Sequence, residues 1–392
     1  MKLLLLSFAF LLAPISALLG GHHEILDLPG KKGPGKGKTI VLVSGDEEYR
    51  TEESMPMLAK ILSQKHGFHC KVLFAWDSAG KHIDPNNQAG VRGWQHLKSA
   101  DLMLIGTRFR KPSAEQAQHV TEFLNAGKPI IGIRTATHAF NGSGKFGDKI
   151  SYGAFGPLVM GEGWVSHHGG HKKEGARGVI VEKNAKHPIL NGVKDVFGPS
   201  DVYGIRRLTD KDTILLRGGV TETLDPKSKL LSGKSTGEHA DKTITQIKKE
   251  IEALKDKKSF SQQLSELMFA LRAKKINDPM QPLAWLHPYE APNGTGGTTF
   301  CTTMGASVDL VSEDLRRLLV NATYHLTGLK VPKKADVAYV DPFHPSFYGF
   351  IRDKNHWPSL DMQPADYGLG KSPTAPEPNG SPKWPWRDSP KD

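Results

Sequence analysis

The sequence predicts an α/β protein built on a doubly wound, mostly parallel β-sheet. Four short, mostly apolar segments with the length of buried strands lie within about a hundred residues of one another. Segments with the composition of surface helices separate them. Strands and helices that alternate in this way form parallel sheets, because each helix carries the chain back to the same end of the sheet.

The predicted elements follow one another from Thr39 onward. The first strands are expected at 39–44, 69–74, 102–105 and 129–133. The helices between them are expected at 53–64, 90–99 and 114–126. Further apolar runs extend the predicted sheet, at 178–182, 213–216, 283–285 and 298–302. A last amphipathic helix is expected from Ser312, a suitable N-cap, to Gly328.

The chain begins with the pattern of a secretory signal peptide. Lys2 precedes an apolar run, and small residues lead to a cleavage site expected after Ala17. The run is too short to span a bilayer, and no second long apolar run follows. We therefore expect signal peptide 1–17, no membrane span and export to the periplasm or the extracellular space. Residues 18–38 form a predicted Gly/Lys-rich linker.

The remaining boundaries define one domain at 39–329, an insert and a tail. The insert, 227–277, is lysine-rich and carries apolar residues at helical spacing, which predicts a helical hairpin. The tail, 330–392, is rich in Pro and is expected to be extended and flexible. Cys70 and Cys301 lie in predicted strands, so we expect both to be core residues, with a disulfide as the alternative.

The formal net charge of +11 raises the question of a nucleic-acid partner. The lysines concentrate in the linker and in the insert, and no stripe of aromatic and basic residues accompanies them. Such a stripe is what nucleic-acid-binding surfaces usually show. We therefore expect a solvated basic surface and no nucleic-acid partner.

In a parallel sheet, ligands bind beyond the carboxyl ends of the strands, where loops converge. The loop after the first strand contains Asp46 and Glu48, and the loop after 102–105 contains Arg108. We expect Asp46 and Arg108 to contact a ligand. Glu48 is the candidate acid–base carboxylate, because burial in such a loop raises a carboxyl pKa.

The segment from Pro129 to Phe140 resembles a catalytic strand-to-helix elbow, in which the turn residue is usually Ser or Cys. Here Arg134 takes that position, which argues against a Cys-dependent amidotransferase. Arg134 is expected to hold an anion or a developing oxyanion, or to be a structural salt-bridge partner. Thr135 is a candidate ligand contact and a weak nucleophile, and His138 is the candidate for proton transfer.

Three histidines, His167, His168 and His171, lie within five residues on a Gly-containing loop. Neighbouring side chains on an extended chain point in opposite directions, so at most two of the three can share one ion. Three interpretations remain open. His167 and His171 hold a divalent metal such as zinc, His167 or His168 is a general acid or base, or the loop is simply a polar surface.

Asp201 and Tyr203 are candidates for sugar recognition, through hydrogen bonds to hydroxyls and stacking on a pyranose face. The alternative is a turn Asp and a core Tyr. The sequence contains no phosphate-binding Walker loop and no dinucleotide fingerprint. No organic cofactor is therefore expected, and a divalent metal is the one inorganic candidate.

An ordered set of motifs resembles the ThuA-like, trehalose-utilization family. These motifs are Pro129–Phe140, Trp164–His168, His187–Gly192, Asp201–Tyr203, Pro282–Trp285 and Thr302–Gly305. The tail segment 341–350 also resembles exported members. The resemblance implies a flavodoxin-like fold similar to class I glutamine amidotransferases. The family often has His where this chain has Arg134 and Ala306, so two of its histidines are missing here.

The resemblance further implies a role in disaccharide or keto-sugar utilization, with partner oxidoreductases in the same pathway. The expected ligand is a sugar or an oxidised sugar. If the protein is an enzyme, we expect acid–base chemistry of the isomerase, hydratase or lyase type, with His138 and His168 moving protons. The alternatives are a non-catalytic sugar-binding or accessory protein and a metal-dependent hydrolase.

Overall fold

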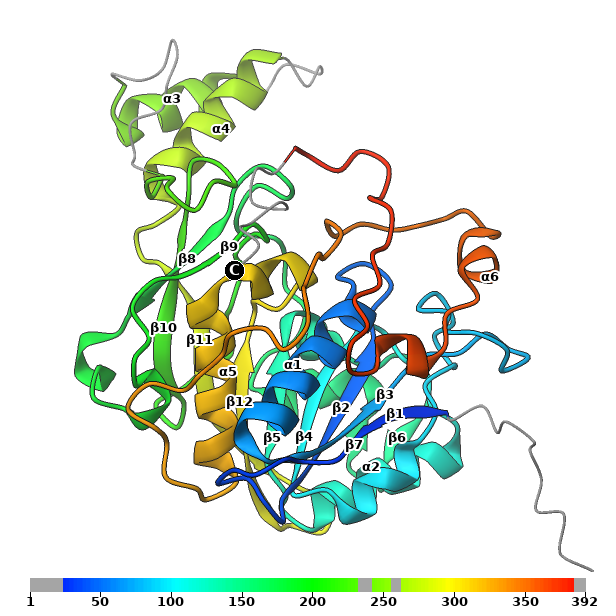
Figure 1. The fold of residues 1–392 in the computed structure, drawn as a ribbon. Helices are drawn as coiled ribbons and strands as arrows, with labels where there is room; N and C mark the ends of the chain where they lie inside the picture. Colours follow the sequence, from blue (N-terminus) through cyan, green and yellow to red (C-terminus); the bar gives the residue numbers. More distant parts are fainter. Residues whose placement is uncertain (1–23, 232–241, 255–261, 384–392) are drawn as a thin grey trace, which may run out of the picture.

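The structure is a computed structural model that describes residues 24–231, 242–254 and 262–383. The predicted signal peptide and the first residues of the predicted linker lie outside these ranges. One ten-stranded sheet forms the centre of the molecule, in the order β1-β3-β2-β4-β5-β12-β11-β10-β8-β9 (Figure 1). Its strands are β1 (Ile25–Leu28), β2 (Thr39–Gly45), β3 (His69–Leu73), β4 (Leu102–Thr107), β5 (Ile130–Ile133), β8 (Ala176–Ile180), β9 (Val196–Gly198), β10 (Thr213–Val220), β11 (Gln281–Glu290) and β12 (Gly296–Thr302).

Five adjacent strands, β3, β2, β4, β5 and β12, are parallel. Renumbered within this half, their order is 2-1-3-4-5, which is the flavodoxin-like order. The chain winds from β2 to β3 in one direction and from β2 through β4 to β5 in the other. This reversal lies between β2 and β4, and the loops that follow these strands are where a ligand is expected in such a sheet.

All eight strands predicted from the apolar runs are present, within a few residues of the predicted bounds. The sheet is, however, only half parallel. β11, β10, β8 and β9 continue it with antiparallel pairings. Runs with little apolar–polar alternation do not reveal strand direction, because strands buried on both faces look alike in parallel and antiparallel settings.

Helices cover both faces of the parallel half. α1 (Thr51–His66) and α5 (Glu313–Leu326) pack on one face, in a core that contains Ile40, Leu42 and Ile131. α2 (Ala114–Asn125) and a 3₁₀ helix at Trp94–Ser99 cover the other face. The last helix starts as predicted, because Ser312 Oγ accepts a hydrogen bond from the Leu315 N–H. The helix expected at 90–99 is only this short 3₁₀ turn.

The described part of the predicted linker is ordered and contains a strand, which corrects the expectation of a simple tether. β1 pairs antiparallel with β3 and forms the edge of the sheet. The following residues pack closely on the end of α1, where a Cβ at Gly30 would lie 2.1 Å from the Gly67 carbonyl oxygen. Gly30 therefore permits close backbone contact with the end of α1, because a side chain would not fit at this position.

The predicted insert contains α3 (Ile244–Leu254) and α4 (Gln262–Lys275), which pack on each other and project from the body (Figure 1). Ile247, Ile251, Leu267 and Ala270 form their own small core. Arg272 ties α4 to the body through an ion pair with Glu174, at 2.8 Å. A two-stranded ribbon, β6 (Lys145–Phe146) and β7 (Ile150–Ser151), follows the elbow on the α2 side.

The C-terminal tail is extended but packed, which corrects the expectation of flexibility for its described part. It runs across α5 and α1 and contains one short helix, α6 (His356–Leu360) (Figure 1). Lys60 pairs with Asp341 at 2.6 Å, and Ser346 Oγ donates to buried Glu53 at 2.7 Å. Phe347 and Tyr348 are fully buried. A Pro-rich segment that has little regular secondary structure of its own can thus pack against a domain.

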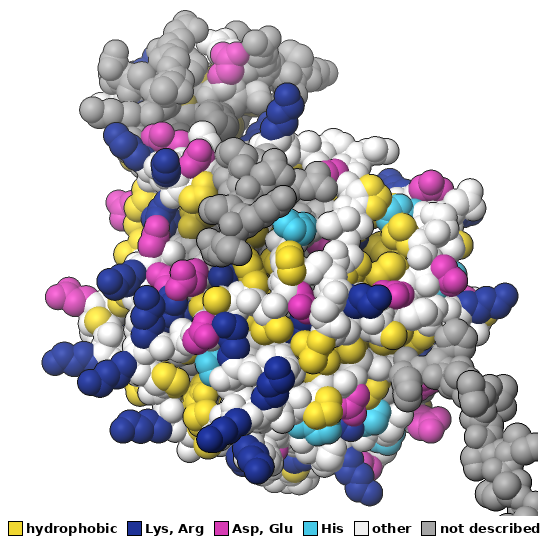
Figure 2. Space-filling model, viewed as in Figure 1, with side chains coloured by type: hydrophobic (Ala, Val, Ile, Leu, Met, Phe, Trp, Pro, Cys, Tyr) yellow, Lys and Arg dark blue, Asp and Glu magenta, His cyan; other side chains and the backbone are white. Residues whose placement is uncertain are grey.

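Cys70 and Cys301 are buried and free, as expected for core residues. None of the described helices combines the length and apolar character that crossing a bilayer requires. On the face shown in Figure 2, basic side chains are scattered along the lower and left margins with acidic side chains among them. This distribution agrees with a solvated basic surface.

Candidate functional site

The elbow forms at the end of β5, as the sequence predicts. Arg134 adopts a left-handed backbone conformation, with φ of 45°, and begins a 3₁₀ turn that ends at His138. Its N–H donates to the Met304 carbonyl at 3.0 Å, which ties the elbow to the loop after β12. A non-glycine residue in this conformation is strained, and such strain is common at functional sites.

The Arg134 guanidinium is fully buried and bonded to protein groups on several sides. Nη1 donates to the carbonyls of Asp201 and Thr303, at 2.6 and 2.8 Å. Nη2 donates to Asp201 Oδ1 at 2.9 Å and to the Tyr49 hydroxyl at 3.1 Å. The rings of Tyr203 and Tyr49 flank the cation, at 3.9 and 4.4 Å. Arg134 is thus a buried salt-bridge partner of Asp201, which is the alternative that the sequence left open, and a role in holding a ligand anion stays a prediction.

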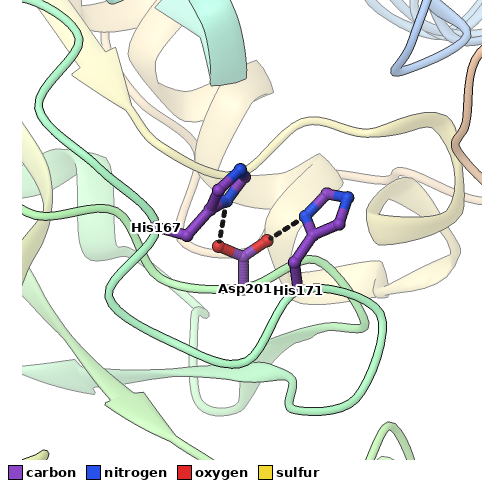
Figure 3. Close-up of side chains that lie close together, drawn as sticks. All are labelled: His167, His171 and Asp201. Carbon is purple, nitrogen blue, oxygen red and sulfur yellow. Dashed lines mark hydrogen bonds and ion pairs between the residues drawn. The ribbon is translucent and has the colours of Figure 1, made fainter. Parts of the chain in front are cut away.

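The Asp201 carboxylate is the centre to which this arginine binds, and two histidines share it (Figure 3). His167 Nδ1 lies 2.7 Å from Oδ2, and His171 Nδ1 lies 3.1 Å from Oδ1. Burial alone would raise the pKa of Asp201, but the charge of Arg134 and the two histidine hydrogen bonds hold it well below its usual range. Asp201 is therefore a buried anion that orients both imidazoles.

The side chains of the neighbouring residues His167 and His168 point in opposite directions, as expected for an extended chain. His167 forms a β-bridge with Tyr203, and the His168 N–H donates to the Val202 carbonyl at 2.8 Å. The His168 ring points the other way, with Nε2 2.7 Å from the Ile276 carbonyl oxygen. His168 is thus apart from the site, and the pair that converges is the predicted metal pair, His167 and His171.

Glu48 lies in the loop after β2, which Asp46 shapes by accepting hydrogen bonds from the Glu48 and Tyr49 N–H groups. Its Oε2 is 3.4 Å from Arg108 Nε, and its Oε1 is 3.6 Å from His171 Nε2. Burial, and then the charge of Asp46, raise the pKa of Glu48 to about 7. Glu48 is therefore the carboxylate that the structure places beside the paired histidines.

A closed ring of side chains surrounds Glu48, and we call it the Glu48 ring. Each member contacts the next, in the order Phe350, Arg108, Phe109, His138, Trp164, His167, His171 and Tyr348. The tail closes it, since Phe350 follows Tyr348 by two residues and the Gly349 N–H donates to the Glu48 carbonyl at 2.8 Å. Segments from four parts of the chain thus meet at the strand ends.

Other predicted residues have different surroundings from those expected. His138 belongs to the ring, and burial and the charge of Arg108 lower its pKa to about 3, which favours the neutral imidazole; its role in proton transfer stays a prediction. Tyr203 is buried behind the site and cannot stack on a sugar. Thr135 is also buried and donates to Asp46, so both are structural rather than ligand contacts. Arg108 remains partly exposed, with Glu47 and Glu48 as partners.

Trp164 and Phe350 are the site residues that reasoning on single positions missed. Trp164 is 41% exposed and Phe350 39% exposed, and they are the two aromatics among the exposed large hydrophobic side chains of the described chain. Both are members of the Glu48 ring. The motifs Trp164–His168 and 341–350 carry the family resemblance, but their composition alone does not indicate that they meet.

A cavity of about 480 Å³ lies beside the start of α5; like the cavities of about 500 Å³ beside α2 and about 370 Å³ beside α5, it is lined by none of these residues. Its charged groups largely satisfy one another, since Asp314 bonds to Arg317 and accepts hydrogen bonds from the backbone at Lys194 and Asp195. The Glu48 ring, in contrast, brings together imidazoles, a carboxylate and exposed aromatic rings. Two of its members, His167 and His171, and the neighbouring Asp201 offer ligand atoms within 4.8 Å of one another.

Comparisons with known proteins give a likeness to solved structures and no match in sequence. No protein-family model and no curated protein matches the sequence. A crystal structure described as that of a ThuA-like protein from Parabacteroides merdae is similar over 76% of this chain and 92% of its own, with 14% sequence identity and a TM-score of 0.42.

Proposed function

We propose that the Glu48 ring binds a sugar-type small molecule and that the protein takes part in carbohydrate utilization after export. The observation that carries this proposal is the pairing of exposed aromatic faces with oriented polar groups. Trp164 and Phe350 present ring surface to solvent, and the Asp201-bound histidines lie between them on one side of the ring. Sugars bind by stacking of their apolar faces on aromatic rings and by hydrogen bonds from their hydroxyls.

The groups available to such a ligand follow from burial. The His167 and His171 side chains are 36% and 30% exposed, and Arg108 is 20% exposed. Each imidazole uses Nδ1 for Asp201, so Nε2 remains for a hydroxyl. Arg108 adds a positive charge that favours an oxidised or acidic sugar. Keto-sugars made by partner oxidoreductases are therefore within the proposed ligand class.

Acid–base chemistry at this site would involve Glu48 and His167, which the sequence already indicates, together with His171. His138 stays neutral, His168 points away and Arg134 is enclosed. In the ring, the oriented imidazoles of His167 and His171 are the groups that reach a bound ligand. Proton transfer from or to a ligand hydroxyl is thus assigned to this pair.

The test is a thermal-shift screen of the chelator-treated protein against glucosides, their keto derivatives and sugar acids. A ligand that binds only the folded state at about 100 times its Kd adds about 2.7 kcal/mol, which raises Tm by several degrees. Trp164→Ala should remove the shift. Leu369→Ala, a matched change at another exposed apolar residue, should keep it. No shift with any member of the panel would end the proposal.

A second candidate is a sugar-binding or accessory protein without catalysis. The enclosure of Arg134 favours it, because the elbow of this chain offers no nucleophile and no free cation. The two candidates separate when a ligand from the screen is incubated with the protein and followed by mass spectrometry. Binding without conversion supports the accessory function, and conversion that is lost in Asp201→Asn supports catalysis.

A further inference from the structure

His167 and His171 each bond to the Asp201 carboxylate through Nδ1. Histidines that bind a metal through Nε2 are often oriented by a carboxylate in this way. Figure 3 shows both rings on the same side of the carboxylate, with the Nε2 edge of each ring directed away from it. The ring centroids are 4.4 Å apart. In metalloproteins, a ligating histidine usually donates its other ring N–H to a carboxylate, which fixes its orientation and its tautomer.

Asp201 fixes the tautomers here as well. Arg134 Nη2 bonds Oδ1 at 2.9 Å, so the carboxylate is held as an anion and only accepts hydrogen bonds. The Nδ1 atoms of His167 and His171 must therefore carry the protons, which leaves the lone pair of a neutral ring on Nε2. The charge of Arg134 is compensated by Asp201 and by the flanking rings of Tyr49 and Tyr203.

Glu48 supplies a third ligand at a suitable spacing. Its Oε1 is 3.6 Å from His171 Nε2, which is longer than a hydrogen bond. Two ligands about 2.1 Å from a tetrahedral ion lie about 3.4 Å apart, so this spacing is close to that of a ligand pair. Arg108 holds the other oxygen of Glu48, with its Nε at 3.4 Å. Each candidate ligand thus has an orienting partner.

We propose that His167 Nε2, His171 Nε2 and a Glu48 carboxylate oxygen bind one divalent metal ion, with Zn²⁺ as the best fit to two imidazoles and a carboxylate. The exposed side of the histidine pair leaves a coordination position for water or ligand. This inference rests on the proposed function and changes one part of it: with an ion bound, the two Nε2 atoms hold the metal, and the metal in place of the imidazoles contacts and polarises a hydroxyl or carbonyl oxygen of a bound sugar.

Metal binding is measured directly, without a sugar. The full exported chain is treated with chelator, exchanged into chelator-free buffer and titrated with ZnCl₂ by calorimetry. Binding of one Zn²⁺ with micromolar or tighter affinity is expected. Replacement by Co²⁺ should give the intense visible absorption of a four-coordinate site, a readout that does not depend on activity.

The variants identify the site. His167→Ala, His171→Ala and Glu48→Gln should each weaken Zn²⁺ binding at least 100-fold, and Asp201→Asn by about 10–100-fold. His168→Ala, a matched change on the same loop, should bind as the wild type does. Circular dichroism checks that each variant is folded, and His171→Asn is an additional conservative replacement.

Absence of Zn²⁺ binding by the wild type, or unchanged binding in both His167→Ala and His171→Ala, overturns the inference. The sugar screen uses chelator-treated protein, so the two proposals fail separately. Sugars that bind while Zn²⁺ does not would leave the proposed function intact and remove the metal. Binding of Zn²⁺ without binding of any sugar would support the metal site and end the proposed sugar-binding function.

Discussion

At the scale of single residues, Arg134 stabilises the site by compensating the charge of the buried Asp201 carboxylate. It is fully buried, and its ion pair with Asp201 lies in the interior. Removal of one partner of a buried pair leaves the other charge without compensation, which usually costs about 3–5 kcal/mol. We predict that Arg134→Met lowers the free energy of unfolding by this amount, as measured by urea denaturation.

Arg207→Met is the matched control. Its guanidinium side chain is 65% exposed and lies near Glu162, at 3.7 Å. Glu162 is buried and accepts backbone hydrogen bonds, but the exposed arginine is screened by water, so its pairing contributes about 1 kcal/mol or less and a small change is expected. A loss below about 1 kcal/mol for Arg134→Met would mean that the elbow tolerates an unpaired Asp201.

Glu52 gives the protein a defined pH dependence. It is buried at the start of α1, and burial raises its pKa from 4.5 to about 7, although Arg50 at 2.8 Å opposes part of this change. Between these pH values the folded state holds a proton that the unfolded state has released. The free energy of unfolding should therefore fall as pH rises from about 4.5 to 7 through this group.

Glu52→Gln should remove part of this fall, and urea denaturation at pH 5 and pH 8 measures it. Glu115→Gln, at an exposed position in α2, is the control and should keep the wild-type profile. Equal pH profiles for Glu52→Gln and the wild type would show that Glu52 titrates alike in both states.

Sequence reasoning at this scale succeeded where it rested on local geometry. The opposite directions of His167 and His168 follow from the alternation of an extended chain, and the structure has them. For Arg134 the sequence left a structural salt bridge open as an alternative but could not name the partner, because Asp201 is 67 residues away. Burial of Tyr203 depends on the same long-range contact.

At the scale of elements, the tail belongs to the fold. Tyr348 is fully buried, with its ring 5.1 Å from that of Tyr49. Truncation of a buried aromatic usually costs about 3–5 kcal/mol. We predict a loss of this size for Tyr348→Ala in urea denaturation. Phe350→Ala, two residues later and 39% exposed, should cost less than about 1 kcal/mol. Similar small losses for both would mean that the tail is loosely attached.

The elements that the sequence predicted well are those with strong local signals. α5 begins at its cap residue, and the strands follow the apolar runs. β1 has only four residues, and many of the residues that follow it are glycine and lysine. The sequence therefore shows no alternation of apolar and polar residues that would predict this strand. The tail is held by scattered contacts such as Ser346 to Glu53, which are 293 residues apart. Contacts of that kind leave no local pattern.

At the scale of the whole molecule, the parallel and antiparallel halves of the sheet share one core. Ile131 and Ile133 of β5 belong to the same apolar cluster as Leu283 of β11 and Leu216 of β10. β12 joins the halves by pairing with β5 on one side and β11 on the other. Neither half can therefore unfold without exposing apolar surface of the other.

The helical pair α3 and α4 differs, because its apolar residues pack on each other and its described ion pair to the body is that of Arg272 with Glu174. In native-state hydrogen exchange we predict that the amides of β4 and β10 exchange with the same free energy of opening, which equals the global value, while those of α3 open with a smaller one. Ile247→Ala should lower the α3 value alone. Different opening free energies for β4 and β10 would show that the halves are separate folding units, despite the strand that joins them.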